Sequence, residues 1–161
     1  MGDGKLGSPT QGDLEKKDSM DTLTEQAPIS LDGNGLSIDH VLDVCCAGVK
    51  VALSSESLEA VKTSRAYVDK LIHEERVVYG ITTGFGYFKE RRIGPDALEQ
   101  LQHNLIVSHS AGVGEPLPRE VVRAMLLLRA NALAKGYSGI RPGTLQLLVD
   151  MLNRGVHPRI P

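Results

Sequence analysis

The segment from Arg119 to Lys135 constrains the fold most, because apolar residues occupy nearly every face of the helix that it predicts. Arg123, Arg129 and Asn131 are the exceptions, and Gly136 ends the pattern. A helix that is apolar all round is buried on all sides. A chain of 161 residues has little surface with which to cover it alone, so we expect a partner surface. The two arginines need carboxylate or carbonyl partners.

Other segments carry an apolar stripe at helical spacing between start and stop signals. They predict helices from Ser37 to Gly48, from Ser54 to about Glu74, from Asp96 to Gly112 or Gly114, and from Gly143 to Gly155. A turn is expected at residues 31–36, and extended segments at residues 49–53 and 156–161. The predicted fold class is therefore mainly α, with short extended segments.

Residues 1–29 differ from the rest, because they are rich in polar and charged residues and show no periodicity. Such a stretch buries too little apolar surface to offset the entropy of ordering it, so we expect a disordered leader and a single domain at residues 30–161. The first residues do not show the pattern of a secretory signal.

The net charge of −2 gives no electrostatic argument for binding nucleic acid or an anionic membrane. No apolar run is long enough to span a bilayer. Cys45 and Cys46 are adjacent, and neighbouring cysteines on a helix rarely pair, so we expect reduced thiols in a cytoplasmic protein. No cysteine or histidine cluster predicts a metal site.

Residues 79–86 read Tyr-Gly-Ile-Thr-Thr-Gly-Phe-Gly, a loop with almost no side-chain bulk. Glycine is costly unless the backbone needs unusual dihedrals or close approach, so this loop is a candidate to close over a ligand and carry Tyr79 into a cleft. The alternative is that Tyr79 is a packed aromatic residue before a turn. Phosphate binding is not expected, because no Lys-Ser/Thr follows the loop. The candidate loop residues are Gly80, Thr82, Thr83, Gly84, Phe85 and Gly86.

The helix predicted after Asp96 carries a second candidate, because His109 falls on its apolar stripe and follows Ser108. The stripe contains Leu98, Leu101 and Leu105. A histidine in this setting is either a core residue bonded to the backbone or, near the end of the helix, a residue that reaches a cleft.

Asp96 and Glu99 also form a capping-box pattern, which predicts the start of this helix.

Four stretches resemble, in the same order, segments of the aromatic amino acid ammonia-lyases. They are residues 31–53, the loop Val78-Tyr79-Gly80-Ile81-Thr82-Thr83-Gly84-Phe85-Gly86, the segment Asn104-Leu105-Ile106-Val107-Ser108-His109-Ser110-Ala111-Gly112-Val113-Gly114, and residues 129–140. The resemblance covers roughly residues 30–161. It implies the N-terminal helical portion of an ammonia-lyase-like fold, of the fumarase/aspartase-like superfamily.

Within that family, the pair Ser108 and His109 resembles the histidine enzymes, whereas the phenylalanine enzymes have an aromatic-Leu pair. An imidazole substrate favours a polar partner in its pocket, and a phenyl ring favours an apolar one. The resemblance therefore implies elimination of ammonia from L-histidine to give trans-urocanate, with Ser108 and His109 binding the substrate and Tyr79 removing its β-proton. A phenylalanine or tyrosine ammonia-lyase or an aminomutase is the alternative.

The resemblance also implies a homotetramer and an electrophilic methylidene-imidazolone, which the family makes from an internal Ala-Ser-Gly and uses to capture the substrate amine. The chain contains no Ala-Ser-Gly and stops at Pro161. We therefore expect activity only as part of a complete chain. Two further hypotheses are a truncated, non-catalytic subunit that associates with a full-length lyase, and an unrelated helical binding module.

Overall fold

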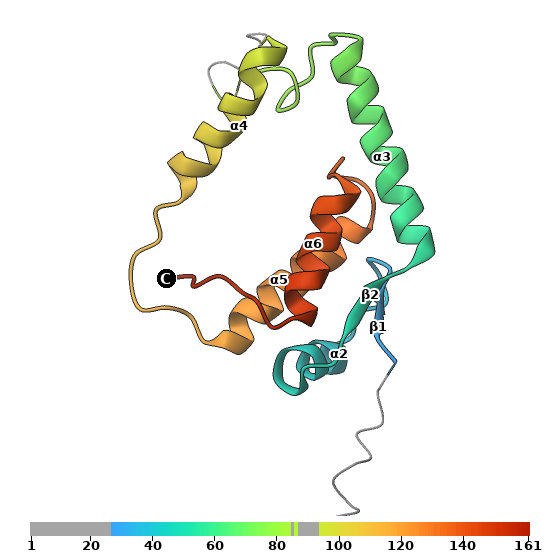
Figure 1. Ribbon diagram of the computed structural model, residues 1–161, viewed down its shortest axis with the longest axis vertical. Helices are drawn as coiled ribbons and strands as arrows, with labels where there is room; N and C mark the ends of the chain where they lie inside the picture. The colour runs from blue at the N-terminus through green and yellow to red at the C-terminus, as the bar shows by residue number, and fades with distance from the viewer. Residues whose placement is uncertain (1–26, 85, 87–93) are drawn as a thin grey trace, which may run out of the picture.

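The computed structural model describes residues 27–84, 86 and 94–161. Residues 1–26 of the predicted leader, and Phe85 in the candidate loop, lie outside the described residues. The mainly helical architecture is confirmed. In chain order (Figure 1) the elements are β1 (Ile29–Leu31), α2 (Ile38–Leu42), the π-helix η1 (Asp43–Ala47), β2 (Val51–Leu53), α3 (Ser55–His73), α4 (Pro95–His109), α5 (Arg119–Ala134) and α6 (Pro142–Asn153).

The pair α5 and α6 forms the centre of the molecule (Figure 1). Helix α3 packs along this pair, η1 packs against α5, and β2 packs against α6. The α4 helix is absent from the main contacts between the described elements, and Figure 1 shows it set apart from α5 and α6. The core is aliphatic, as the scarcity of aromatic residues requires, and its largest fully buried members are Leu31, Val44, Val61, Val122, Leu127, Leu145, Val149 and Leu152.

Arg123 lies inside this core with a side chain that is only 3% exposed. Its Nη1 donates to the carbonyl of Leu152 at 3.0 Å, and its Nη2 donates to the carbonyl of Val44 at 2.7 Å. Carbonyls near helix carboxyl ends lack an intrahelical partner and carry partial negative charge, so a guanidinium suits them. The carbonyl partner expected from the sequence is therefore found, and one side chain joins α5, α6 and η1.

The two strands form a parallel sheet in which Ile29, Ser30 and Leu31 pair with Val51, Ala52 and Leu53. Asn153, the last residue of α6, bonds the free edge of β2: its Oδ1 accepts from the Val51 N–H at 2.9 Å, and its Nδ2 donates to the Val51 carbonyl at 2.8 Å. The amide side chain thus takes the place of a neighbouring strand and ties β2 to the helical centre.

The described residues alone do not bury α5 on every side, and the expected partner surface stays a prediction. One face is buried, but Val121, Met125 and Leu128 are 43%, 44% and 52% exposed. These three residues are spaced by four and three positions, so they form one stripe along the helix. The described residues therefore leave an apolar face of α5 open.

Two local predictions about α4 are wrong. The helix begins at Pro95 with Gly94 as N-cap, so Asp96 lies inside the first turn and not at the cap position that the predicted capping box requires. Proline suits the first helical position, because its φ is already helical and it has no N–H that would need an acceptor. The helix therefore starts at Pro95, before the predicted Asp96. The helix ends at His109, before Gly112, because the Ser110 hydroxyl bonds the Ile106 carbonyl at 2.8 Å and competes with a further turn.

The first turn and the first helix differ from their predictions as well. Leu31, expected in a turn, is instead the last residue of β1 and is fully buried, because it pairs with Leu53. The predicted helix from Ser37 is capped by the Ser37 side chain as expected, but after Leu42 it widens into η1 before Gly48 ends it with φ +77°. No helix among the described residues is long and apolar enough to cross a bilayer.

A glycine sets the distance between α3 and the end of α5. Gly136 has φ +76°, and a Cβ at this position would lie 2.7 Å from the backbone carbon of Ala60. Any side chain at residue 136 would therefore separate the two helices.

Replacing Arg123 by methionine should destabilise the chain, because two buried carbonyls lose their partner while the side chain stays long and apolar. We expect the free energy of unfolding to fall by about 2–4 kcal/mol in urea unfolding followed by circular dichroism. The control Arg129→Met removes the same charge from an exposed position of α5 and should cost less than about 0.5 kcal/mol. Equal unfolding midpoints for the two variants would contradict the role of Arg123.

An alanine at residue 136 would have an unfavourable positive φ and would also collide with α3. Gly48 provides the control, because it has nearly the same φ but a Cβ there would meet no atom within 4 Å. Gly48→Ala should lower the free energy of unfolding by about 1–2 kcal/mol, the cost of a left-handed alanine. Gly136→Ala should cost about 1–3 kcal/mol more, because it also forces α3 away. Similar losses in the same urea experiment would show that the two helices do not depend on this contact.

Candidate functional site

The candidate loop follows the end of α3, where the chain changes direction. The helix α3 starts after Ser54, where the sequence predicts a start. The Ser54 hydroxyl caps it by accepting from the Ser57 N–H at 3.0 Å, and the helix ends at His73. Glu75 then adopts φ +53°, and the Arg76 N–H bonds back to the Leu71 carbonyl at 3.1 Å. This ending resembles a Schellman motif and leads residues 77–84 away from the tip of α3 (Figure 1).

The loop is a compact turn held together from the inside. Thr82 and Thr83 are 5% and 0% exposed. The Thr82 hydroxyl donates to the Arg76 carbonyl and accepts from the Val78 N–H at 2.9 Å. Gly80 has φ +75°, where a side chain would be strained. The sequence predicts a mobile loop, and it gives no sign of this internal bonding.

Tyr79 lies at the outside of that turn, with 62% of its surface exposed. It is therefore not a packed core aromatic in the described residues, which was the alternative hypothesis. Gly84 is buried, whereas Gly86 is exposed, and a Cβ at Gly86 would meet nothing within 4 Å. Residues 82–84 of the turn are therefore buried, whereas Tyr79 is exposed to solvent.

Ser108 and His109 form the last two residues of α4, and both are exposed. His109 Nδ1 lies 2.8 Å from the Leu105 carbonyl oxygen and 3.0 Å from the Ser108 hydroxyl, which itself donates to the same carbonyl at 2.9 Å. A carbonyl can only accept, so Nδ1 carries the hydrogen in this contact and the neutral ring keeps Nε2 as an acceptor. The backbone bond expected of a core histidine is present, but the ring is not in the core.

A cavity of about 710 Å³ lies beside the loop and is lined by Gly80 and Ile81. Its other lining residues come from α3, α4, the segment between α5 and α6, and the first turn of α6, namely Arg65, Val68, Ile72, Glu99, Gln102, Ser138, Gly139, Arg141 and Thr144. Arg65 pairs with Asp69, and this bond, with the charge of Arg141 nearby, holds the pKa of the Asp69 carboxyl below its usual value. The cavity lining therefore carries two arginines, Arg65 and Arg141, and one acid, Glu99.

Tyr79, Ser108 and His109 do not line the cavity beside the loop. His109 is the last of the 15 residues of α4, a helix about 20 Å long.

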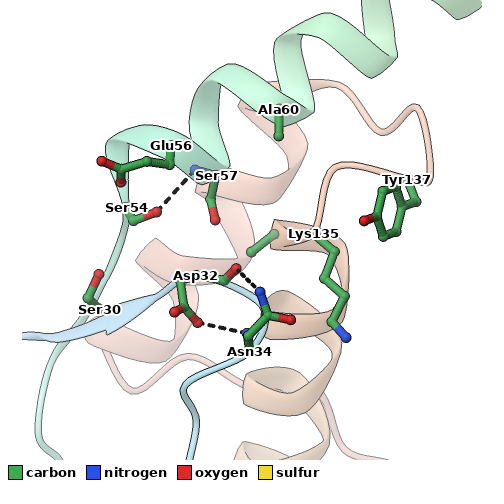
Figure 2. Close-up of a pocket in the computed structure, with 10 residues that line it drawn as sticks. Ser30, Asp32, Asn34, Ser54, Glu56, Ser57, Ala60, Lys135 and Tyr137 are labelled. Carbon is green, nitrogen blue, oxygen red and sulfur yellow. Dashed lines mark hydrogen bonds between the residues drawn. The ribbon is translucent and has the colours of Figure 1, made fainter.

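Figure 2 shows a second, polar pocket of about 570 Å³ that the sequence does not predict. It lies between the turn after β1, the start of α3 and the end of α5. Asp32 Oδ1 accepts from the N–H groups of Gly35 and Asn34 at 2.6 and 2.7 Å, and these bonds lower the pKa of the Asp32 carboxyl. The signals, Asp-Gly-Asn-Gly and Ser-Ser-Glu-Ser, predict only a turn and a helix start when each is considered alone.

The described residues offer no group of three or more histidine, cysteine or acidic side chains that could hold a metal ion. Cys45 and Cys46 are both free, and only Cys46 is exposed. Burial raises the pKa of the Cys45 thiol, which makes it a poor nucleophile. Phenol, hydroxyl and imidazole groups are therefore the better candidates for chemistry.

Residues 36–161 match the family model described as aromatic amino acid lyase. The chain is 64% identical over 131 residues to the histidine ammonia-lyase of Gloeobacter violaceus, covering 81% of this chain and 26% of the relative. It is 53% identical over 133 residues to the histidine ammonia-lyase of Alkaliphilus metalliredigens, covering 83% and 26%. The chain thus spans about a quarter of the length of the curated relatives it matches.

Solved structures show the same likeness. The histidine ammonia-lyase of Trypanosoma cruzi aligns with a TM-score of 0.77 and 43% identity, over 84% of this chain and 26% of that one. The ergothioneine-degrading ergothionase of Treponema denticola aligns with a TM-score of 0.79 and 36% identity, over 84% and 27%. The tyrosine aminomutase of Streptomyces globisporus gives 0.79 and 36%, over 84% and 26%.

Proposed function

Because this chain belongs to the aromatic amino acid lyase family, we propose that it forms the N-terminal part of a histidine ammonia-lyase. The proposed reaction removes ammonia from L-histidine and yields trans-urocanate. The observation that carries this proposal is the 64% identity to the histidine ammonia-lyase of Gloeobacter violaceus. A carbon–nitrogen lyase is the reaction class that the family itself supports.

His109 has the chemistry to recognise an imidazole substrate. Its Nδ1–H is engaged by the Leu105 carbonyl, so its Nε2 is available to accept a hydrogen bond from an imidazole N–H of the substrate. Ser108 bonds the same carbonyl and lies 3.0 Å from His109 Nδ1, which holds the ring in this tautomer. We assign Ser108 and His109 to substrate binding.

Tyr79 is the proposed base that takes the β-proton from the substrate. Its exposure on an internally hydrogen-bonded turn suits a group that must reach a ligand from outside the core. Gly80, Thr82, Thr83, Gly84, Phe85 and Gly86 form the loop that presents it. A phenol on an internally bonded turn loses little freedom when the substrate binds.

The remaining parts of the reaction come from outside these residues. The methylidene-imidazolone that the family implies would make the substrate amine a leaving group, but the chain holds no Ala-Ser-Gly from which to form it. Tyr79 and His109 also line neither of the two pockets described above. We therefore propose that the site is completed in a complete, cytoplasmic and tetrameric lyase, and that the open stripe of Val121, Met125 and Leu128 is covered there.

A chimera tests the proposal directly. Residues 36–161 of this chain replace the aligned residues of the Gloeobacter violaceus enzyme, and the product is assayed with L-histidine, L-phenylalanine and L-tyrosine. We expect urocanate to form from histidine at a kcat/KM within about tenfold of the unmodified relative. Preference for phenylalanine or tyrosine, or a folded chimera without activity, would overturn the proposed function.

Tyr79→Phe in the chimera should lower kcat for histidine by about a hundred- to ten-thousand-fold, because the base is lost while the ring remains. The thermal midpoint should stay within a few degrees, since the hydroxyl lies on an exposed side chain. The control Tyr137→Phe removes the hydroxyl from another exposed tyrosine and should leave kcat unchanged. A fully active Tyr79→Phe chimera would remove this residue from the reaction.

His109→Leu in the chimera should lower kcat/KM for histidine and raise the relative rate with phenylalanine, because the acceptor for the imidazole N–H is replaced by an apolar side chain. Loss of one such bond to a substrate costs about ten- to a thousand-fold in selectivity. His103→Leu, at an exposed residue of the same helix, is the control. An unchanged ratio of the two substrates would exclude His109 from substrate selection.

A further inference from the structure

Two threonine hydroxyls bracket Tyr79 inside the loop. Thr82 Oγ1 bonds the Arg76 carbonyl and the Val78 N–H, which lie before Tyr79 in the chain. Thr83 Oγ1 accepts from the N–H of Gly80, directly after Tyr79, at 3.4 Å, and donates to the Gly84 carbonyl at 3.0 Å. Both residues that flank Tyr79 are thus bonded to a buried hydroxyl.

The backbone closes the same turn. The Val78 carbonyl accepts from the N–H groups of Ile81 and Thr82 at 3.1 and 3.0 Å. Together with the threonine bonds, this fixes the peptide units on either side of Tyr79, while the Tyr79 side chain remains outside the turn. The backbone therefore sets the direction of the Tyr79 Cα–Cβ bond, from which the phenol extends.

Because the hydroxyls of Thr82 and Thr83 are buried, the turn must provide them with hydrogen-bond partners. Valine has the same shape as threonine, and a buried hydroxyl is unfavourable unless it is bonded. Thr82 uses its hydroxyl as both donor and acceptor at 5% exposure. A core position alone would be filled as well by valine, so the hydroxyl is explained by the bonds that it makes around Tyr79.

We propose that Thr82, supported by Thr83, is a positioning residue whose hydroxyl aims the Tyr79 phenol at the substrate carbon. This inference rests on the proposed role of Tyr79 as the base. Thr82 touches no substrate in this scheme; it acts through Tyr79. Displacing a catalytic group by about 1 Å lowers turnover by up to about a hundredfold, so loss of the Thr82 bonds should reduce kcat.

The test uses Thr82→Val and Thr82→Ser in the chimera that carries residues 36–161. Thr82→Val should lower kcat by about 10- to 100-fold with KM changed less than about threefold. Thr82→Ser keeps the hydroxyl and should stay within about threefold of the chimera. Thr63→Val is the matched control, because Thr63 bonds the Glu59 carbonyl on an exposed part of α3 and should leave kcat unchanged.

A double-mutant cycle with Tyr79→Phe separates positioning from general stability. If Thr82 acts through Tyr79, Thr82→Val should lower the residual kcat of the Tyr79→Phe chimera by less than about threefold. A structural role would lower kcat by the same factor in both backgrounds, which would overturn the inference. A fully active Thr82→Val chimera would do the same.

The outcomes distinguish the inference from the function on which it rests. Full activity of Tyr79→Phe defeats the proposed function, whatever Thr82 does. A slow Tyr79→Phe together with a normal Thr82→Val leaves the function intact and defeats only the inference. If Thr82→Val fails to fold, Thr83→Val is measured in the same cycle, and equal losses in both backgrounds would again overturn the proposal.

Discussion

The buried guanidinium of Arg123 is the interaction on which the rest of this structure depends. It bonds the carbonyls of Val44 and Leu152, so one side chain of α5 holds the π-helix η1 and the end of α6. In these two contacts the guanidinium is stabilised by the partial negative charge of backbone carbonyls and not by a carboxylate. Asn153, directly after Leu152, then bonds the edge of β2. Arg123 therefore holds the end of α6, and the end of α6 in turn holds the sheet through Asn153.

The candidate functional groups lie outside this bonded centre. Tyr79 stands on a turn beyond the end of α3, and His109 ends an α4 helix whose Ile106 and Val107 are 68% and 60% exposed. Each is locally ordered, Tyr79 by threonine bonds and His109 by the Leu105 carbonyl. Neither residue lines the cavity beside the loop among the described residues. This agrees with a chain that spans about a quarter of its curated relatives.

Sequence patterns predict those structural features that depend only on residues close together in the chain. The start of α3 after Ser54, the stop at Gly48 and the carbonyl partners of a buried Arg123 follow from neighbouring residues or from charge alone. The same patterns place Leu31 in a turn, wrongly, because its strand partner is distant in sequence. They miss the bonds of Thr82 because a turn's hydroxyl partners depend on the backbone path, which composition does not reveal. The resemblance makes Tyr79 and His109 candidates, but only the structure shows that neither lines the cavity beside the loop.

The central claim is that Tyr79 and His109 serve one site once the chain is completed. A crystal structure of the chimera with bound trans-urocanate measures this most directly. We predict the Tyr79 hydroxyl within about 4 Å of the carbon that lost its proton, and His109 Nε2 within about 3.2 Å of an imidazole nitrogen of the product. A product bound with either residue facing a different cavity would contradict the account.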